Sequence, residues 1–134
     1  MRTPSQTVGP YFAIGLSRRR QNELPRGSVR LHGKVLDGAG RPVEDALVEL
    51  WSPASGFARC GTEAAGEFTF LLPRDARRFE VTVFARGLLK PVRTRLYAPG
   101  EAAEDSTMVA RAEGDGLRFD VHLQGEHGTA FFEL

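Results

Sequence analysis

Few side chains of this chain are of the types that bind transition metals or act as nucleophiles. They are three histidines, two tyrosines and one cysteine, at His32, His122, His127, Tyr11, Tyr97 and Cys60. His32 alternates with basic residues along its segment, which is a poor setting for a cation. A metal site made of His122, Asp120 and His127 is conceivable, but isolated histidines are more often solvated surface residues. A lone cysteine is more often a small buried apolar residue than a nucleophile. We therefore expect no metal ion on this chain.

The N-terminal segment is a second candidate for function, because residues 3–12 read TPSQTVGPYF. Its two prolines each fix φ near about −65° and push the preceding residue towards extended geometry, so the segment is not the start of a helix. Gly9 allows close approach to another surface, and Tyr11 presents a ring with a hydroxyl at its tip. Such a stiff arm is suited to lie across a neighbouring surface. The alternative is an ordinary terminal segment that happens to contain prolines.

This arm resembles the N-terminal signature of the α subunits of protocatechuate 3,4-dioxygenase, in the intradiol ring-cleavage dioxygenase family. Three further stretches resemble the same subunits in the same order, so the resemblance runs from the first residues to the last. They are GKVLDG at 33–38 running on to ALVELW at 46–51, VTVFARGLL at 81–89, and LRFDV with LQG at 117–125. The resemblance implies an antiparallel β-sandwich of the transthyretin (prealbumin) type.

The hydrophobic pattern by itself predicts the same class of fold. Apolar and polar residues alternate with a period of two over several short segments, and turn residues separate these segments every 8–12 residues or so. No helical periodicity is sustained. We therefore predict one all-β domain, an antiparallel β-sandwich, with residues 1–28 as an extended arm and loop and residues 29–134 as the sandwich. A last stretch at 130–132 is a candidate edge strand.

The resemblance also implies chemistry that this sequence lacks. The catalytic chain of such enzymes holds a ferric iron with two tyrosines and two histidines, and the histidines lie one residue apart on a strand. No His-x-His pair occurs here, and Arg78 and Glu80 fall at the corresponding positions. Arginine has no free lone pair for a metal. The tyrosine-bearing loops after Trp51 and Phe70 are also missing, so the chain is a shortened form. We expect Fe(III) on a partner β subunit, and this chain alone to be iron-free and inactive, without catalytic residues.

In the resembled enzymes the active site lies where the α and β subunits meet, and the α arm walls the substrate pocket. Carried over to this chain, Thr7, Gly9, Pro10 and Tyr11 match that arm. Arg86 matches the arginine at the end of the equivalent α-subunit strand, where a guanidinium would attract the carboxylate of protocatechuate. The alternative for Arg86 is an ion pair with an acidic surface residue.

Two aromatic residues are predicted to face away from the core. Trp51 and Phe84 fall on the outward side of their strands, which indicates an interface with another chain. For Trp51 the alternative is that a loop or the arm covers it.

Composition excludes several classes of function. The chain has 18 Lys+Arg against 17 Asp+Glu, and a nucleic-acid-binding domain usually has a clear basic excess. The basic run at 18–20 is expected to be a solvated loop. No apolar run reaches the roughly 18 residues of a membrane span, and no secretory signal follows Met1. One cysteine excludes an internal disulfide and suits a reducing compartment, so we expect a soluble, cytoplasmic protein.

These observations lead to one main hypothesis and two others. The main one is a non-catalytic α-type subunit in a hetero-oligomer, completing the substrate pocket and assembly of an iron-bearing β subunit. That enzyme would cleave a catechol-type aromatic substrate, protocatechuate, between its ring hydroxyls with O2. The alternative is a stand-alone β-sandwich binding or interaction module, since residues 33–51 also resemble transthyretin-like and carboxypeptidase regulatory domains. The least favoured is an independent iron enzyme with unusual ligands.

Overall fold

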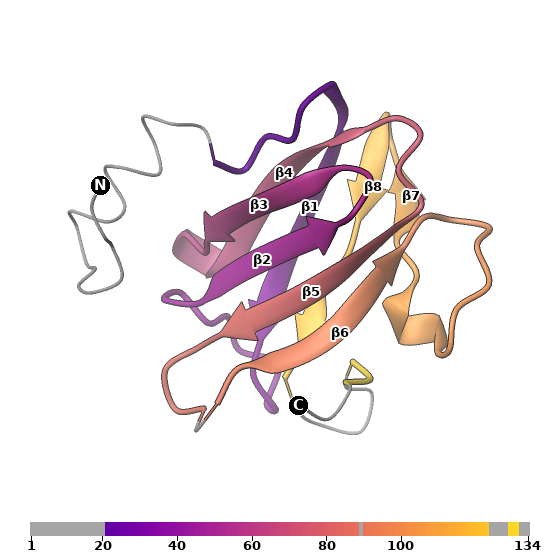
Figure 1. Cartoon of the computed structure of the whole chain (residues 1–134). Helices are drawn as coiled ribbons and strands as arrows, with labels where there is room; N and C mark the ends of the chain where they lie inside the picture. Colours follow the sequence, from indigo (N-terminus) through magenta and orange to yellow (C-terminus); the bar gives the residue numbers. More distant parts are fainter. Residues whose placement is uncertain (1–20, 89, 124–128, 132–134) are drawn as a thin grey trace.

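Two β-sheets pack face to face in a computed structural model that describes residues 21–88, 90–123 and 129–131 (Figure 1). The predicted β-sandwich is therefore confirmed. Two short 3-10 turns, η1 and η2, lie at Ala64–Gly66 and Ser106–Met108. The strands are β1 (Gly27–Leu36), β2 (Leu47–Ser52), β3 (Gly56–Gly61), β4 (Glu67–Pro73), β5 (Arg78–Phe84), β6 (Val92–Tyr97), β7 (Arg111–Glu113), β8 (Gly116–Arg118) and β9 (Val121–His122).

The order of the strands shows how the chain divides between the sheets. One sheet has the order β4-β1-β8-β7, with β9 also paired to β1, and the other has the order β3-β2-β5-β6. The pairs are antiparallel, as predicted, except that β8 and β9 run parallel to β1. The chain reaches β8 and β9 after a long connection from β6 in the other sheet, and such a crossover allows parallel pairing.

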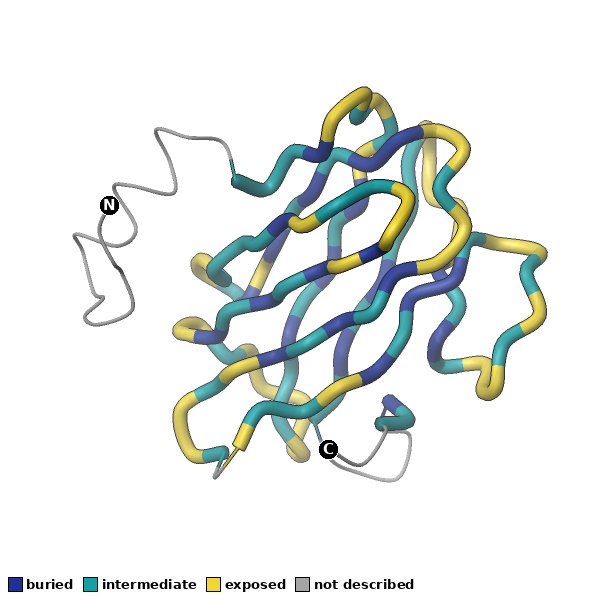
Figure 2. Tube along the Cα trace, viewed as in Figure 1, coloured by how far each residue is buried: buried dark blue, intermediate teal, exposed yellow. Residues whose placement is uncertain are grey.

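One hydrophobic core fills the space between the sheets. Residues along each long strand alternate between buried and more exposed positions, as Figure 2 shows, and the buried set is the one that the period-two pattern predicts. The fully buried large side chains come from both sheets: Leu31, Val35, Val48, Leu50, Phe70, Val81, Val83, Thr94 and Val121.

A glycine in β1 allows the chain between β8 and β9 to lie directly against the sheet. A Cβ atom on Gly33 would lie 1.8 Å from the carbonyl oxygen of Phe119. The amide of Phe119 donates a hydrogen bond to the carbonyl of His32 over 3.0 Å. Only glycine leaves room for this approach.

The residues before β1 link the edges of the two sheets. The amide of Arg59 on β3 donates to the carbonyl of Gln21, and the amide of Leu71 on β4 donates to that of Asn22, each over 3.0 Å. Leu24 is buried in the core. The arm at residues 1–20 lies outside the described residues, and the boundary at residues 28 and 29 stays a prediction.

Two further details of the fold bear on the sequence-based expectations. Residues 130 and 131 lie in no strand, so the predicted edge strand is wrong over these described positions. This segment is instead held by a side chain, because the hydroxyl of Thr94 donates to the carbonyl of Ala130 over 2.7 Å. In the part of the chain that the structure describes, no helix is long and apolar enough to cross a bilayer.

Candidate interface on the outer face of one sheet

All three exposed large apolar side chains of the described residues lie on the outward side of the sheet β3-β2-β5-β6. Trp51 and Phe57 are each 48% exposed and Phe84 is 37% exposed. Charged residues of the same strands share this surface with them. We call the surface the aromatic face: Trp51, Phe57 and Phe84 with Glu49, Arg59, Arg78, Glu80, Arg93 and Arg95.

The register of the strands positions these aromatic residues. Trp51 on β2 lies directly opposite Phe57 on β3, so the two residues are cross-strand neighbours. The guanidinium of Arg59 lies 5.1 Å from the centre of the Phe57 ring and donates to Glu49 Oε2 over 2.8 Å. Burial raises the pKa of Glu49, and the nearby Arg59 acts in the opposite direction. Apolar and charged contacts thus alternate across the face.

An ion network occupies the part of the aromatic face nearest to β6. Arg95 Nε donates to Glu80 Oε2 over 2.9 Å, and Arg95 Nη1 also pairs with Glu104. The hydroxyl of Tyr97, a residue that is only 6% exposed, donates to Glu104 Oε1 over 2.6 Å. This bond is the main reason why the pKa of Glu104 lies below its ordinary value. The network ties the loop after β6 to the sheet.

Arg78 and Glu80, which stand where the catalytic chains of the resembled enzymes have their two iron-binding histidines, do not fit a ferric iron. Arg78 is exposed and offers no lone pair, and the carboxylate of Glu80 is already engaged by a guanidinium. The hydroxyl of Tyr97 is engaged as a hydrogen-bond donor to the carboxylate of Glu104. Among the described residues, no three His, Cys, Asp or Glu side chains lie close enough together to hold a metal ion.

Of the predicted pocket residues, the structure places Arg86. It follows β5, and its Nε lies 2.9 Å from Asp45 Oδ2 while its side chain remains 85% exposed. An acidic surface partner, the alternative weighed for Arg86, is therefore present, and the pocket role stays a prediction. Thr7, Gly9, Pro10 and Tyr11 lie outside the described residues.

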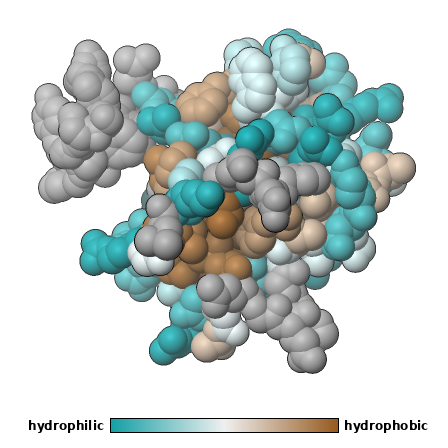
Figure 3. All heavy atoms as spheres, turned by 60° about the horizontal axis from the view of Figure 1, so that its bottom comes forward, coloured by the Kyte–Doolittle hydropathy of each residue, from teal (hydrophilic) through white to brown (hydrophobic). Residues whose placement is uncertain are grey.

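The end of the sandwich where β5 finishes carries a further apolar area. Figure 3 looks towards this end, the lower one in Figure 1, and shows apolar residues gathered at its centre with polar residues around them. Val43, Ala85 and Val92 are partly buried residues that pack there against the core. Phe84, the last residue of β5, is therefore a member of the aromatic face that lies at this end of the sandwich.

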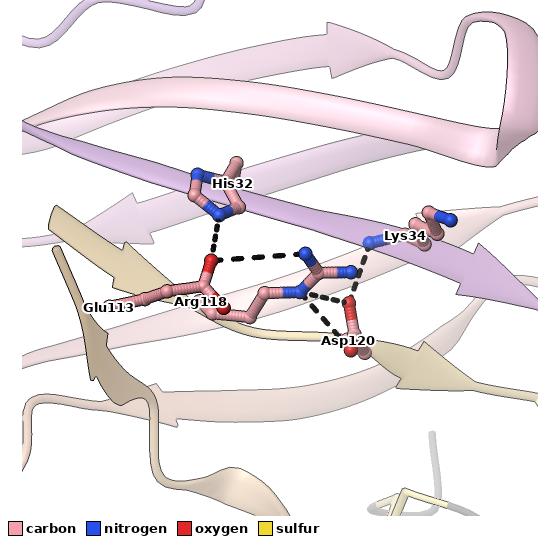
Figure 4. Close-up of polar contacts among 5 residues, drawn as sticks. All are labelled: His32, Lys34, Glu113, Arg118 and Asp120. Carbon is pink, nitrogen blue, oxygen red and sulfur yellow. Dashed lines mark hydrogen bonds and ion pairs between the residues drawn. The ribbon is translucent and has the colours of Figure 1, made fainter.

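The outward side of the other sheet has a different character. His32 Nε2 lies 2.5 Å from Glu113 Oε1, Arg118 Nε donates to Asp120 Oδ1 over 3.1 Å, and the same oxygen accepts from the amide of Lys34 over 2.9 Å (Figure 4). The hydrogen bond from His32 holds the pKa of Glu113 below its ordinary value. We call this surface the polar face; it borders a hollow of ≈ 230 Å³ lined by Arg30, His32, Gly33, Lys34, Glu67, Phe68, Thr69 and Arg118.

Comparison with known proteins gives the family. The chain is 31% identical to the protocatechuate 3,4-dioxygenase alpha chain of Burkholderia cepacia, covering 98% of this chain and 97% of that protein. It is 30% identical to the alpha chain of Pseudomonas putida, covering 98% and 96%. The chain belongs to the protocatechuate 3,4-dioxygenase alpha chain family. No protein-family model matches it.

This alpha chain is shorter than its relatives. The alignment with the Burkholderia cepacia protein extends over 191 positions, whereas the chain has 134 residues, so the relative has insertions that are absent here. The shortened form that the sequence predicts is confirmed.

Solved structures of intradiol dioxygenases share the sandwich. The dioxygenase domain of a dioxygenase and carbohydrate-binding protein fusion from Streptomyces sp. SirexAA-E superposes with a TM-score of 0.58 at 24% identity, covering 94% of this chain and all of that one (100%). Catechol 1,2-dioxygenase from Acinetobacter radioresistens gives a TM-score of 0.59 at 17% identity, covering 81% and 55%. At these identities the likeness establishes the fold.

Sequence reasoning found only part of the aromatic face of this alpha chain. The pattern of residues predicts Trp51 and Phe84 as outward-facing but not Phe57, because Phe57 stands in a short segment next to a turn. The sequence does contain a signal for Phe57. It shares its side of the strand with the charged Arg59, and the small apolar Ala58 between them faces the other way. The partnership of Glu104 with Tyr97 and Arg95 left no comparable signal, since the loop that brings Glu104 back to the sheet has no periodic pattern.

Proposed function

We propose that this alpha chain is a non-catalytic subunit of a protocatechuate 3,4-dioxygenase and works in a hetero-oligomer with an iron-bearing β chain. The observation that carries the proposal is the 31% identity over 98% of this chain and 97% of the Burkholderia cepacia alpha chain. A stand-alone binding module would need the sandwich alone. A likeness over nearly the whole of both chains, arm included, favours the subunit.

The side chains of this chain indicate which of the two subunits binds the iron. Arg78 and the engaged Glu80 do not bind iron, so the metal belongs to the β chain and this chain alone is inactive. The assembly cleaves protocatechuate between its ring hydroxyls with O2. We place the complex in the cytoplasm, and nucleic acid and membrane are not among its partners.

The part of this chain in the reaction is to complete the substrate pocket. Thr7, Gly9, Pro10 and Tyr11 of the arm form its edge, where a small and rigid backbone lies close to an aromatic substrate. Arg86 contributes positive charge. Its ion pair with Asp45 lies at the surface, and such exposed pairs contribute little energy, so the carboxylate of a substrate can take the place of Asp45.

Co-expression with the β chain of an intradiol dioxygenase from the same source tests the proposal. The chain alone should be colourless and free of iron, and size-exclusion chromatography should yield a coloured complex that consumes O2 with protocatechuate. A chain that never joins a β chain would contradict the subunit role. Colour in the chain alone would contradict the argument about its ligands.

The role of Arg86 has its own test in that complex. Arg86→Ala should raise KM for protocatechuate but leave KM for catechol, which has no carboxylate, unchanged. Arg74→Ala is a matched control, because Arg74 is also an exposed arginine next to a strand end. Equal effects on both substrates would mean that Arg86 does not contact the carboxylate.

A further inference from the structure

The aromatic face has the composition of a protein–protein interface. Interface cores are enriched in aromatic residues and arginine, and the residues that dominate binding are most often Trp, Tyr and Arg. Trp51 and Phe57 form a cross-strand pair, each 48% exposed, with the guanidinium of Arg59 against the Phe57 ring. Large aromatic side chains gain most when another surface covers them.

The charges on this face indicate what kind of surface covers it. Its two glutamates already have guanidinium partners, Glu49 with Arg59 and Glu80 with Arg95. Arg78 and Arg93 are exposed and have no acidic partner among the described residues. The face therefore offers aromatic rings beside unpaired positive charge, and its complement is an apolar recess with acidic side chains at its rim.

The same charges disfavour two possible occupants that this chain itself supplies. A symmetric dimer through this face would bring together two surfaces that each carry more arginine than glutamate, and such like-charge contact is costly. The chain's own arm joins the fold at Gln21, beside β3, and its adjoining residues at 18–20 are all arginine. These residues would be repelled by the face. A different chain with acidic side chains is the occupant that remains.

We propose that the aromatic face is the surface through which this alpha chain binds its β chain. In the complex, Trp51 and Phe57 enter an apolar recess of the β chain, and Arg78 and Arg93 pair with carboxylates at its rim. This inference rests on the proposed function, and it adds the side of the sandwich that makes the contact. The polar face remains exposed to solvent in the complex.

Two substitutions on the aromatic face and one on the polar face test this assignment by isothermal titration with a purified β chain. Trp51→Ser should weaken binding roughly thirtyfold, as expected for a central aromatic residue of an interface. Arg93→Glu should weaken it about tenfold and remove most of its dependence on salt. Arg30 is also an exposed arginine but lies on the polar face, so Arg30→Glu should change the affinity less than about twofold.

The outcomes separate this inference from the proposed function. If the wild-type chain binds the β chain and Trp51→Ser and Arg93→Glu bind equally well, the surface is wrong and the subunit role stands. If the wild-type chain binds no β chain, both fall. A dimer of the chain alone that Trp51→Ser dissociates would assign the face to a second copy and overturn the proposal. Circular dichroism of each variant confirms that it is folded, which is expected because all three side chains are exposed.

Discussion

The two outer faces of this sandwich use the same β-strand alternation for opposite purposes. On the polar face, several outward side chains have charged partners within the chain: His32 contacts Glu113, and Arg118 contacts Asp120. On the aromatic face, ion pairs are also present, but Trp51, Phe57 and Phe84 stay exposed. Among the described residues, the exposed large apolar side chains all belong to the aromatic face and none belongs to the polar face.

The difference shows where in this fold stability and binding are separated. The polar-face contacts join β7 and the segment at Asp120 to β1, and Arg118 joins β8 to the same two segments, so these contacts hold the short strands in place. The aromatic rings lie over strands that the core already holds, since Val48, Leu50 and Val81 beneath them are fully buried. Loss of the polar-face contacts should therefore affect folding, and loss of the exposed aromatic rings should affect binding.

The strongest test of this comparison disrupts the sheet behind the polar face. Gly33→Ala would place a Cβ atom 1.8 Å from the carbonyl oxygen of Phe119, so the backbone between β8 and β9 would have to move away from β1. We expect a loss of at least about 3 kcal/mol in the free energy of unfolding, at the upper end for overpacked sites. Chemical denaturation monitored by circular dichroism measures it.

Gly61→Ala, in the sheet behind the aromatic face, is the matched control. A Cβ atom there would lie 3.8 Å from its nearest neighbour, the carbonyl oxygen of Ala46, which is an ordinary contact. We expect a neutral effect or a small gain of about 0.5 kcal/mol, because alanine restricts the unfolded chain. Equal losses from both substitutions would show that strand propensity, and not the approach of Phe119, accounts for the cost.

The ion network at the edge of the aromatic face should matter less. Tyr97→Phe removes the hydroxyl that donates to Glu104 and leaves the buried ring in place. The free energy of unfolding should fall by about 1 kcal/mol, a typical value for one hydrogen bond. Thr69→Val on the polar face is a control, because the Thr69 hydroxyl donates no hydrogen bond to any residue that the structure describes. It should change stability by less than about 0.5 kcal/mol.

Residue patterns were sufficient for the fold because one physical rule governs it. Along β1, β2 and β5 the alternation of apolar and polar residues predicted which side is buried, and the structure agrees. The parallel pairing of β8 and β9 with β1 was not predicted, since alternation carries no information on which strand becomes a neighbour. This packing requires a glycine at position 33. The requirement can be recognised only in the structure, where the backbone of Phe119 lies against Gly33.

The candidate site was less accessible to the sequence. An exposed tryptophan on the outward side of a strand could be predicted for Trp51, because its position follows from the alternation. The partners of the charged residues could not, because His32 and Glu113 are far apart in the chain and meet only through the β7–β8 hairpin. The same holds for Arg86, whose partner Asp45 comes from another connection.

Acid should affect the two faces in opposite directions. The pKa of Glu113 on the polar face is lowered, chiefly by its hydrogen bond with His32, so this group stabilises the fold above its ordinary value of 4.5 and ceases to do so as the pH falls through the lowered pKa. The pKa of Glu49 on the aromatic face is raised by burial, so its contribution is present below the ordinary value and is lost as the pH rises through the raised pKa.

Two glutamine variants separate these contributions. The melting temperature of each is measured between about pH 3 and 7, at intervals of roughly one pH unit. Glu113→Gln should be less stable than wild type at neutral pH and converge with it in acid. Glu49→Gln should lose stability more steeply than wild type on acidification, because the compensating gain is absent. Parallel profiles for the two variants would mean that the faces do not differ in this respect.

The smallest expected effect sharpens the comparison most. Trp51→Ser removes the largest side chain of the aromatic face, yet we expect the free energy of unfolding to change by no more than about 0.5 kcal/mol, because about half of that side chain is in solvent. Its neighbour Leu50 points into the core, so Leu50→Ala should cost about 2 to 5 kcal/mol in the same denaturation experiment. If Trp51→Ser proved as costly as Leu50→Ala, the ring would be part of the fold. The aromatic face would then be no better supported as a binding surface than the polar face.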